Sequence, residues 1–225
     1  MESPRSLDSA ERRRLAQLPV DEQLQRFEAI VARSPLVDAV LDRAAALALP
    51  AWYLTAGCLF QTVWNALCGR APTHGIRDYD LFYFDDGDTS WEAEDVVIRR
   101  CAEAFGDLGV QVEVRNQARV HLWYPHRFGV LVDRFRTCED GVDAFAMTTC
   151  CVATRRVDGR LRTYAPHGFA DLYNLVLRPN PVRATQAVYE EKARRWLSLW
   201  PNLQVLPWPS DQCERLSGPR YPEHA

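Results

Sequence analysis

The sequence predicts an α+β fold in which a mixed central sheet is flanked by helices. Three observations support this fold class. Apolar side chains recur at helical spacing through residues 21–47, whereas residues 78–85 and 110–116 begin with the polar and apolar alternation that is typical of strands. Asp158 and Gly159 lie between two β-prone runs, which indicates a hairpin.

The first 50 residues are expected to form a helical scaffold. Residues 1–20 are polar and indicate a short solvated helix or a frayed arm. A second helix is predicted over residues 21–32. Ser34 is expected to be the N-cap of a third helix over residues 35–47, because a proline follows it at the first helical position.

The main domain is expected over residues 51–200. It begins with a short aromatic strand at residues 51–55, followed by Gly57 and a helix over residues 59–67. Two glycines and a proline then predict a loop before the strand at residues 78–85.

A turn at residues 86–90 leads into a predicted helix over residues 91–105 and then into the strand at residues 110–116. Residues 119–124 are expected to form a short helix that is broken at Pro125.

Beyond this point we expect a helix near residues 139–146 and the hairpin, with strands at residues 149–157 and 161–164. Two further helices are predicted over residues 168–177 and 185–199. Residues 201–225 are rich in proline and lack periodicity, so they are expected to be an irregular C-terminal tail.

The composition is that of an ordinary globular protein. Hydrophobic residues make up 47% and charged residues 25% of the 225 residues, so the chain can bury a sizeable core. The formal net charge of −3 does not indicate a nucleic-acid-binding protein, although a local basic groove is compatible with it.

Seven cysteines without a Cys-x-x-Cys pair argue against a disulfide framework or a structural zinc site. Without a signal peptide or a membrane-length apolar run, we expect a cytoplasmic protein with no membrane partner.

Two carboxylates are predicted to lie together on one strand. Asp78 and Asp80 are two residues apart and share a face, while Tyr79 and Leu81 point into the core. Carboxylates so close repel each other unless a cation lies between them, and Mg²⁺ prefers such oxygen ligands. On the next predicted strand, Glu113 lies between Val112 and Val114, so its side chain is expected to face away from the core. It is the expected third ligand. Taken singly, each acid is more often a cap or a solvated side chain.

Gly57 supplies a separate feature. A residue without Cβ lets the backbone approach a triphosphate, and the N-terminus of the following helix favours anions. The order of strand, glycine, helix, loop and a strand with Asp-x-Asp is the layout of the nucleotidyltransferase superfamily.

The chain also resembles a bacterial family of nucleotidyltransferase-like proteins over roughly residues 50–205. The motifs that carry the resemblance are AGCLFQTVWNAL at residues 56–67, IRDYDLFYFD at 76–85, EVRNQARVHLWY at 113–124, APHG at 165–168, VLRPNP at 176–181 and KARRW at 192–196.

This resemblance implies the nucleotidyltransferase (polymerase-beta-like) fold and the transfer of a nucleoside monophosphate from a nucleoside triphosphate such as ATP. The acceptor would be a hydroxyl group of a small molecule or a protein, and pyrophosphate would be released. Asp78, Asp80 and Glu113 would be the catalytic residues and would hold Mg²⁺ or Mn²⁺, with Glu113 also helping to activate the acceptor. The alternative is a non-catalytic nucleotide- or metal-binding module of the same fold.

Further candidate site residues lie near Gly57 or Glu113 in the sequence, apart from the more distant Lys192. The nucleotide-binding candidates are Thr55, Gly57 and Gln61, and the substrate-pocket candidates are Asn116, Gln117, Arg119, His121 and Lys192. Simpler interpretations remain for several of them: turn capping for Asn116 and Gln117, a surface ion pair for Arg119, and a structural role for His121.

The glycine motif departs from the superfamily pattern. Ala56 stands where the superfamily often has glycine, and Cys58 replaces the serine of many relatives. Phe60 and Gln61 replace an expected basic or amide pair. These departures weaken the expected grip on phosphates and motivate the non-catalytic alternative.

Overall fold

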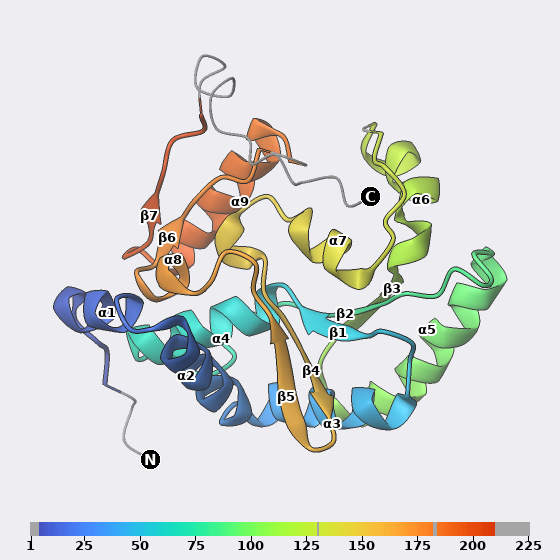
Figure 1. The fold of residues 1–225 in the computed structure, drawn as a ribbon, viewed down its shortest axis with the longest axis horizontal. Helices are drawn as coiled ribbons and strands as arrows, with labels where there is room; N and C mark the ends of the chain where they lie inside the picture. Colours follow the sequence, from blue (N-terminus) through green and yellow to red (C-terminus); the bar gives the residue numbers. More distant parts are fainter. Residues whose placement is uncertain (1–4, 130, 182–183, 210–225) are drawn as a thin grey trace, which may run out of the picture.

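The structure is a computed structural model, which describes residues 5–129, 131–181 and 184–209. Within these residues, a five-stranded sheet with the order β3-β2-β1-β4-β5 lies at the centre of the molecule, surrounded by helices (Figure 1). Strands β2 and β3 are parallel, whereas the other neighbouring strands are antiparallel. The mixed sheet flanked by helices confirms the predicted fold class.

The strands of this sheet are short. They are β1 (Tyr53–Thr55), β2 (Tyr79–Tyr83), β3 (Val112–Asn116), β4 (Ala153–Val157) and β5 (Arg160–Tyr164). Both faces of β2 are covered: Tyr79 and Leu81 lie in the main core, as predicted, and Phe82 lies in a smaller cluster with Tyr53. Because side chains alternate along a strand, Asp80 shares the face of Phe82.

The N-terminal helices form where the sequence predicts them. They are α1 (Ser9–Ala16), α2 (Val20–Ala32) and α3 (Pro35–Leu47). Ser34 is the N-cap residue of α3, but its side chain makes no capping hydrogen bond. Phe27 of α2 packs against Phe169, with ring centroids 5.1 Å apart, so this helix shares the main core of the sheet.

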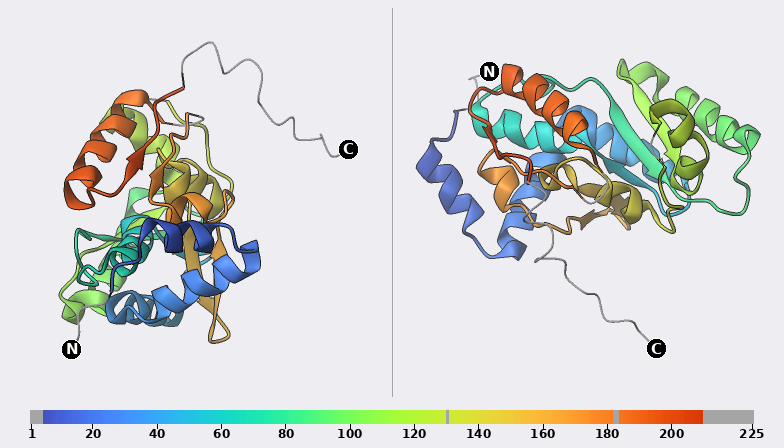
Figure 2. Two further views of the ribbon diagram at one scale, coloured as in Figure 1. Left: turned by 90° about the vertical axis from the view of Figure 1, so that its left-hand side faces the viewer. Right: turned by 90° about the horizontal axis from the view of Figure 1, so that it is seen from above.

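Helices α4 (Gly57–Cys68) and α9 (Gln186–Leu199) are distant in sequence and packed together (Figure 2). Phe60 and Trp64 of α4 contact Trp196 of α9, with ring centroids 4.9 Å and 5.8 Å apart. Just after α9, the indole N–H of Trp200 donates to the Asn65 side chain at 3.0 Å. The aromatic contacts therefore fix α9 along the helix that follows β1.

Helix α5 (Trp91–Phe105) connects β2 to β3 and confirms the predicted helix. Ser90 is the N-cap residue, and its hydroxyl accepts a hydrogen bond from the backbone N–H of Ala93 at 3.2 Å. A short 3-10 turn, η1 (Gly106–Leu108), and the left-handed Gly109 end the crossover.

Helix α6 (Val120–Phe128) corrects one prediction, because it continues through Pro125. It ends instead at Gly129, which adopts a φ of 69° and donates its backbone N–H to the Pro125 carbonyl at 2.9 Å. A left-handed glycine terminates helices readily, since it has no Cβ to clash. Helix α7 (Cys138–Asp143) lies close to the predicted position.

The hairpin of β4 and β5 is confirmed. Asp158 and Gly159 both adopt positive φ, 50° and 73°, as the favoured two-residue hairpin turn requires. The first strand is shorter than predicted and begins at Ala153, because the preceding residues form the 3-10 turn η3 (Thr148–Cys150).

The C-terminal part differs from the prediction in two places. The expected helix over residues 168–177 is reduced to α8 (Ala170–Tyr173), because Leu175 turns with a φ of 58°. Strand β6 (Val176–Leu177) then pairs in parallel with β7 (Gln204–Val205), so the start of the predicted irregular tail is a strand. Residues 210–225 of that tail lie outside the described residues. No helix in the described ranges has the length and apolar character needed to cross a membrane.

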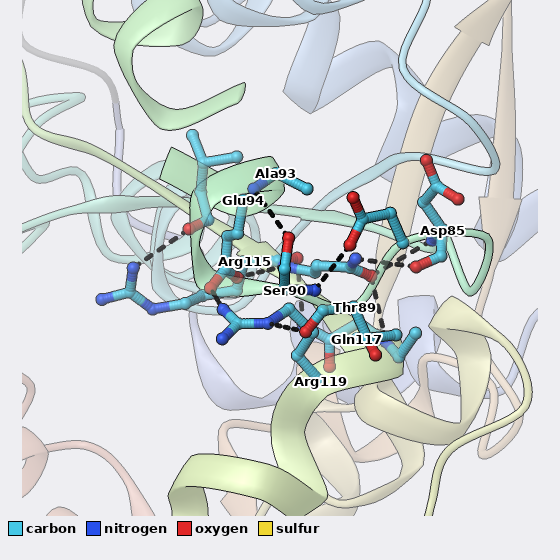
Figure 3. Close-up of polar contacts among 12 residues, drawn as sticks. Asp85, Thr89, Ser90, Ala93, Glu94, Arg115, Gln117 and Arg119 are labelled. Atoms are coloured by element: carbon cyan, nitrogen blue, oxygen red, sulfur yellow. Dashed lines mark hydrogen bonds and ion pairs between the residues drawn. The ribbon is translucent and has the colours of Figure 1, made fainter. Parts of the chain in front are cut away.

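A buried ion pair fixes α5 to the end of β3 (Figure 3). Glu94 and Arg119 are only 2% and 8% exposed. One carboxylate oxygen of Glu94 pairs with the Arg119 guanidinium, and the other accepts the backbone N–H of Asn116 at 2.8 Å. Arg119 Nε also donates to the Thr89 carbonyl at 2.8 Å. Removing one partner would leave the other charge buried without compensation.

We therefore expect Glu94→Ala to lower the free energy of unfolding by about 3–5 kcal/mol, the cost of an unpaired buried charge. Asp95→Ala is the matched control, since it breaks an ion pair with Arg99 on the same helix whose arginine is solvent-exposed. The control should cost less than about 1 kcal/mol. Urea denaturation of both variants measures the difference, and equal losses would show that the buried pair does not hold α5 in place.

Candidate functional site

A cavity of about 200 Å³ lies where the N-terminus of α4, the loop before β2, the segment before η3 and one face of α9 meet. Its walls combine acidic, basic and aromatic side chains. They are formed by Ala56, Gly57, Phe60, Gln61, Gly75, Arg77, Asp78, Asp80, Phe145, Ala146, Met147, Cys150, Lys192, Arg195 and Trp196.

Both carboxylates of the Asp-x-Asp pair line this cavity. Asp78 directly precedes β2, and Asp80 is the second residue of that strand. Strand pairing places Asp80 opposite Thr55 of β1 on one side and opposite Glu113 of β3 on the other. Residues opposite one another in a sheet share a face, so three acids from two parallel strands gather at one end of the sheet.

The charge on Asp80 is poorly compensated. Burial, then the neighbouring Asp78 and then Glu113 raise the pKa of the Asp80 carboxyl to about 7, whereas Lys192 and Arg115 act in the opposite direction. A divalent cation between the two aspartates would remove this repulsion. Mg²⁺ often binds through one or two protein carboxylates and completes its shell with water and substrate phosphates, so Asp78 and Asp80 fit such an ion.

Glu113 is adjacent to this pair in register but is held by its own strand. Its carboxylate accepts a hydrogen bond from Gln111 Nε2 at 3.1 Å and lies 3.8 Å from an Arg115 nitrogen. In the described ranges, no three His, Cys, Asp or Glu side chains are arranged to hold a metal ion. The expected third ligand would therefore have to release Gln111 and Arg115 before it could approach an ion at Asp80.

The backbone entering α4 is strained at Ala56. Its φ of 62° and ψ of −142° lie close to a region that glycine alone adopts readily. The departure from glycine noted in the sequence therefore falls where a side chain is least tolerated. The next residue, Gly57, lines the cavity, and a Cβ there would lie 3.1 Å from Gln61 Nε2.

The nucleotide-binding candidates divide into two groups. Gly57 and Gln61 line the cavity, and the buried Gln61 Oε1 has no hydrogen-bond partner among the described residues. Thr55 is fully buried and does not line the cavity. Its hydroxyl donates to the Val152 carbonyl at 2.8 Å, a hydrogen bond that joins β1 to the segment before β4.

The substrate-pocket candidates divide in the same way. Lys192 lines the cavity, whereas Asn116, Gln117, Arg119 and His121 do not. The Asn116 amide accepts the backbone N–H of Asp85 at 3.1 Å and donates to the carbonyl of the same residue at 2.8 Å.

The other members of this group hold the chain around the end of β3. The Gln117 side chain donates a hydrogen bond to the Arg115 carbonyl at 3.4 Å. It also packs closely on Gly141, where a Cβ on residue 141 would lie 2.2 Å from Gln117 Oε1. The ion pair of Arg119 is buried rather than on the surface. His121 Nδ1 is buried and has no hydrogen-bond partner in the described part of the chain.

Two basic residues of the cavity were not among the predicted site residues. Arg77 directly precedes the Asp-x-Asp pair, and Arg195 lies three residues after Lys192 on α9. Helical spacing places residues i and i+3 on one face, so this spacing would have identified Arg195 once Lys192 was chosen. Trp196 is buried in the core and also forms part of the cavity wall.

Comparison with known proteins gives two findings. A family model described as nucleotidyltransferase matches residues 42–205. A structure determined by NMR and described as a CCA-adding enzyme head domain superposes with a TM-score of 0.66 and 24% sequence identity, over 82% of this chain and 96% of the other. At this identity the likeness concerns the fold alone. No curated protein matches the sequence.

The strain at Ala56 leads to a stability prediction. Ala56→Gly should raise the free energy of unfolding by about 1 kcal/mol, because relief of about 1–3 kcal/mol of backbone strain exceeds the entropy that glycine adds to the unfolded chain. Ala66→Gly is the control, since Ala66 is exposed within α4 and glycine in a helix interior costs about 1 kcal/mol. Thermal and urea unfolding should move in opposite directions for the two variants. Destabilisation by both would mean that Ala56 is not strained.

Proposed function

The chain belongs to the nucleotidyltransferase family, whose model spans residues 42–205, and from this membership we propose a specific reaction. The protein transfers a nucleoside monophosphate from a nucleoside triphosphate to a hydroxyl group of a small molecule or a protein, and pyrophosphate is released. The observation that carries the proposal is the placement of Asp78 and Asp80 in a cavity at the N-terminus of α4, with Asp80 in register with Glu113.

In this proposal Asp78 and Asp80 hold Mg²⁺ or Mn²⁺. Glu113 joins them when it leaves Gln111 and Arg115, which is a small change because its side chain is 36% exposed. Bound ions of this kind would stabilise negative charge on the attacking and leaving oxygens. The backbone at Gly57 and the first turn of α4 would contact phosphate oxygens, since a helix N-terminus attracts anions.

The bond changes balance without a further reactant. The acceptor oxygen forms a bond to the α-phosphorus, and the bond from that phosphorus to the bridging oxygen of the β-phosphate breaks. Pyrophosphate leaves with the electron pair of the broken bond. The hydroxyl proton of the acceptor passes to a carboxylate, and Glu113 is the candidate because it is beside Asp80 and partly open to solvent.

A second candidate is a module of the same fold that binds nucleotide or metal without turnover. Two observations favour it: Ala56 occupies a glycine conformation at the start of α4, and Glu113 is engaged by residues of its own strand. Binding without transfer of the nucleoside monophosphate would identify this second candidate.

Asp78→Asn and Asp80→Asn test the site. Each removes one carboxylate at nearly constant size, so the fold should persist while Mg²⁺-dependent binding of nucleoside triphosphate is lost. Glu103→Gln, on the exposed part of α5, is the matched control and should bind as the unmodified protein does. Calorimetry with ATP, GTP, CTP and UTP in the presence of Mg²⁺ measures binding.

Transfer is measured separately, with nucleotides labelled at the α-phosphate and with fractions of a bacterial lysate as acceptors. Each aspartate variant should lose about 100-fold or more of the transfer rate, the scale expected when a preorganised electrostatic contact is removed. Unchanged Mg²⁺-dependent binding and transfer in both variants would show that this cavity is not the active site.

A further inference from the structure

The motif VLRPNP, at residues 176–181, runs alongside the segment that forms one wall of the cavity. That segment, residues 145–147, lies between α7 and η3 and is not part of the central sheet. Met147 forms an isolated antiparallel bridge with Pro179, and the backbone N–H of Thr148 donates to the Arg178 carbonyl at 3.1 Å. The motif therefore supplies the pairing that a neighbouring strand would otherwise give this segment.

The two prolines of the motif limit what its backbone can donate. Proline has no N–H, so over residues 179–181 only Asn180 has a backbone donor. That N–H donates to the Ala146 carbonyl at 2.9 Å. The carbonyl groups of Asp143 and Phe145, on either side of this contact, depend on a side chain instead.

The side chain of Asn180 supplies the further donors. Its amide nitrogen donates to the Asp143 carbonyl at 2.8 Å and to the Phe145 carbonyl at 2.9 Å. An amide nitrogen carries two N–H groups, one for each of these carbonyls. Asn180 is only 5% exposed, and a buried carbonyl without a donor is unfavourable. One residue therefore makes three hydrogen bonds to the chain that forms the cavity wall.

The position of this segment matters for the Asp-x-Asp pair, because residues 145–147 all line the same cavity. Phe145 stacks on Phe82 of β2, two residues beyond Asp80, with ring centroids 5.9 Å apart. Cys150 also lines the cavity, and its backbone N–H donates to the Met147 carbonyl at 3.0 Å. Displacing the segment would therefore change the shape of the cavity and expose the Cys150 thiol.

We propose that Asn180 is a positioning residue that fixes residues 145–147 and thereby sets the shape of the cavity. An aspartate in its place has nearly the same size, but its carboxylate has no N–H to donate and would repel the two carbonyl oxygens. The motif thus acts on the site from outside it, since residues 176–181, all of them described, do not line the cavity.

Thiol labelling of the full 225-residue chain tests this role without assuming any reaction. Iodoacetamide alkylates thiolates, and mass spectrometry follows Cys150 and Cys101 separately. Cys101 is buried on α5 and does not line the cavity, so it reports global unfolding. Burial raises the pKa of both thiols, so both should react slowly in the unmodified protein. Asn180→Asp should accelerate labelling of Cys150 about 10-fold or more relative to Cys101, because only the wall opens.

Asn202→Asp is the matched control, since it makes the same chemical change at an exposed turn after α9. Both labelling rates should stay within twofold. Asn180→Ala removes the side-chain donors without adding a charge, and it carries the test if circular dichroism shows that Asn180→Asp does not fold. Equal acceleration at both cysteines would show a general loss of stability and would overturn the positioning role. An unchanged Cys150 rate in a folded variant would overturn it as well.

A second measurement rests on the proposed function. In calorimetry with Mg²⁺ and each nucleoside triphosphate, Asn180→Ala should bind about 10-fold more weakly or worse, because the site is no longer preorganised. Selective labelling of Cys150 with an unchanged nucleotide affinity would overturn the link between the wall and ligand binding. Absence of nucleotide binding in the unmodified protein would count against the proposed function, whereas the labelling result would still decide the role of Asn180.

Discussion

Repulsion between like charges governs this protein's cavity. Asp78 and Asp80 bring negative charge to the start of β2, and burial raises the pKa of Asp80 to about 7. Opposite them, Lys192 and Arg195 bring positive charge on α9 and have no ionic partner in the described part of the chain. Lys192 offsets only part of the rise in the Asp80 pKa. A metal ion together with a polyphosphate would compensate both at once, which is the electrostatic reason why a nucleoside triphosphate suits the site.

The scaffold holds these charges apart and in place. The position of β2 between β1 and β3 sets Asp80 beside Glu113. Trp196 attaches α9 to α4 and orients its basic side chains. Asn65 connects the two regions: its side chain accepts the Trp200 indole N–H at 3.0 Å and donates to two backbone carbonyls of the loop before β2, at 3.1 Å and 2.9 Å. Packing between α4 and α9 thereby controls where the basic residues lie.

Local patterns in the sequence were enough to predict the fold class and the Asp-x-Asp pair, because strand alternation alone places Asp78 and Asp80 on one face. The pairing of Glu113 with Asp80 needed the superfamily layout, since no local pattern specifies which strands are neighbours. Arg195 could be inferred only from its helical spacing to Lys192, because the docking of α9 on α4 depends on aromatic contacts between distant segments. Arg119 shows the opposite difficulty. Its position shortly after Glu113 made it a pocket candidate, but the sequence alone does not distinguish a pocket residue from one that forms a buried ion pair, as Arg119 does with Glu94.

The most direct test of the central claim is a crystal structure of the protein with Mn²⁺ and a non-hydrolysable ATP analogue, measured at a wavelength where manganese scatters anomalously. We expect anomalous density between Asp78 and Asp80, and the β- and γ-phosphates within hydrogen-bond distance of Lys192 and Arg195. A bound nucleotide in this cavity with no manganese at the two aspartates would contradict the claim that they form a metal-dependent nucleotide site.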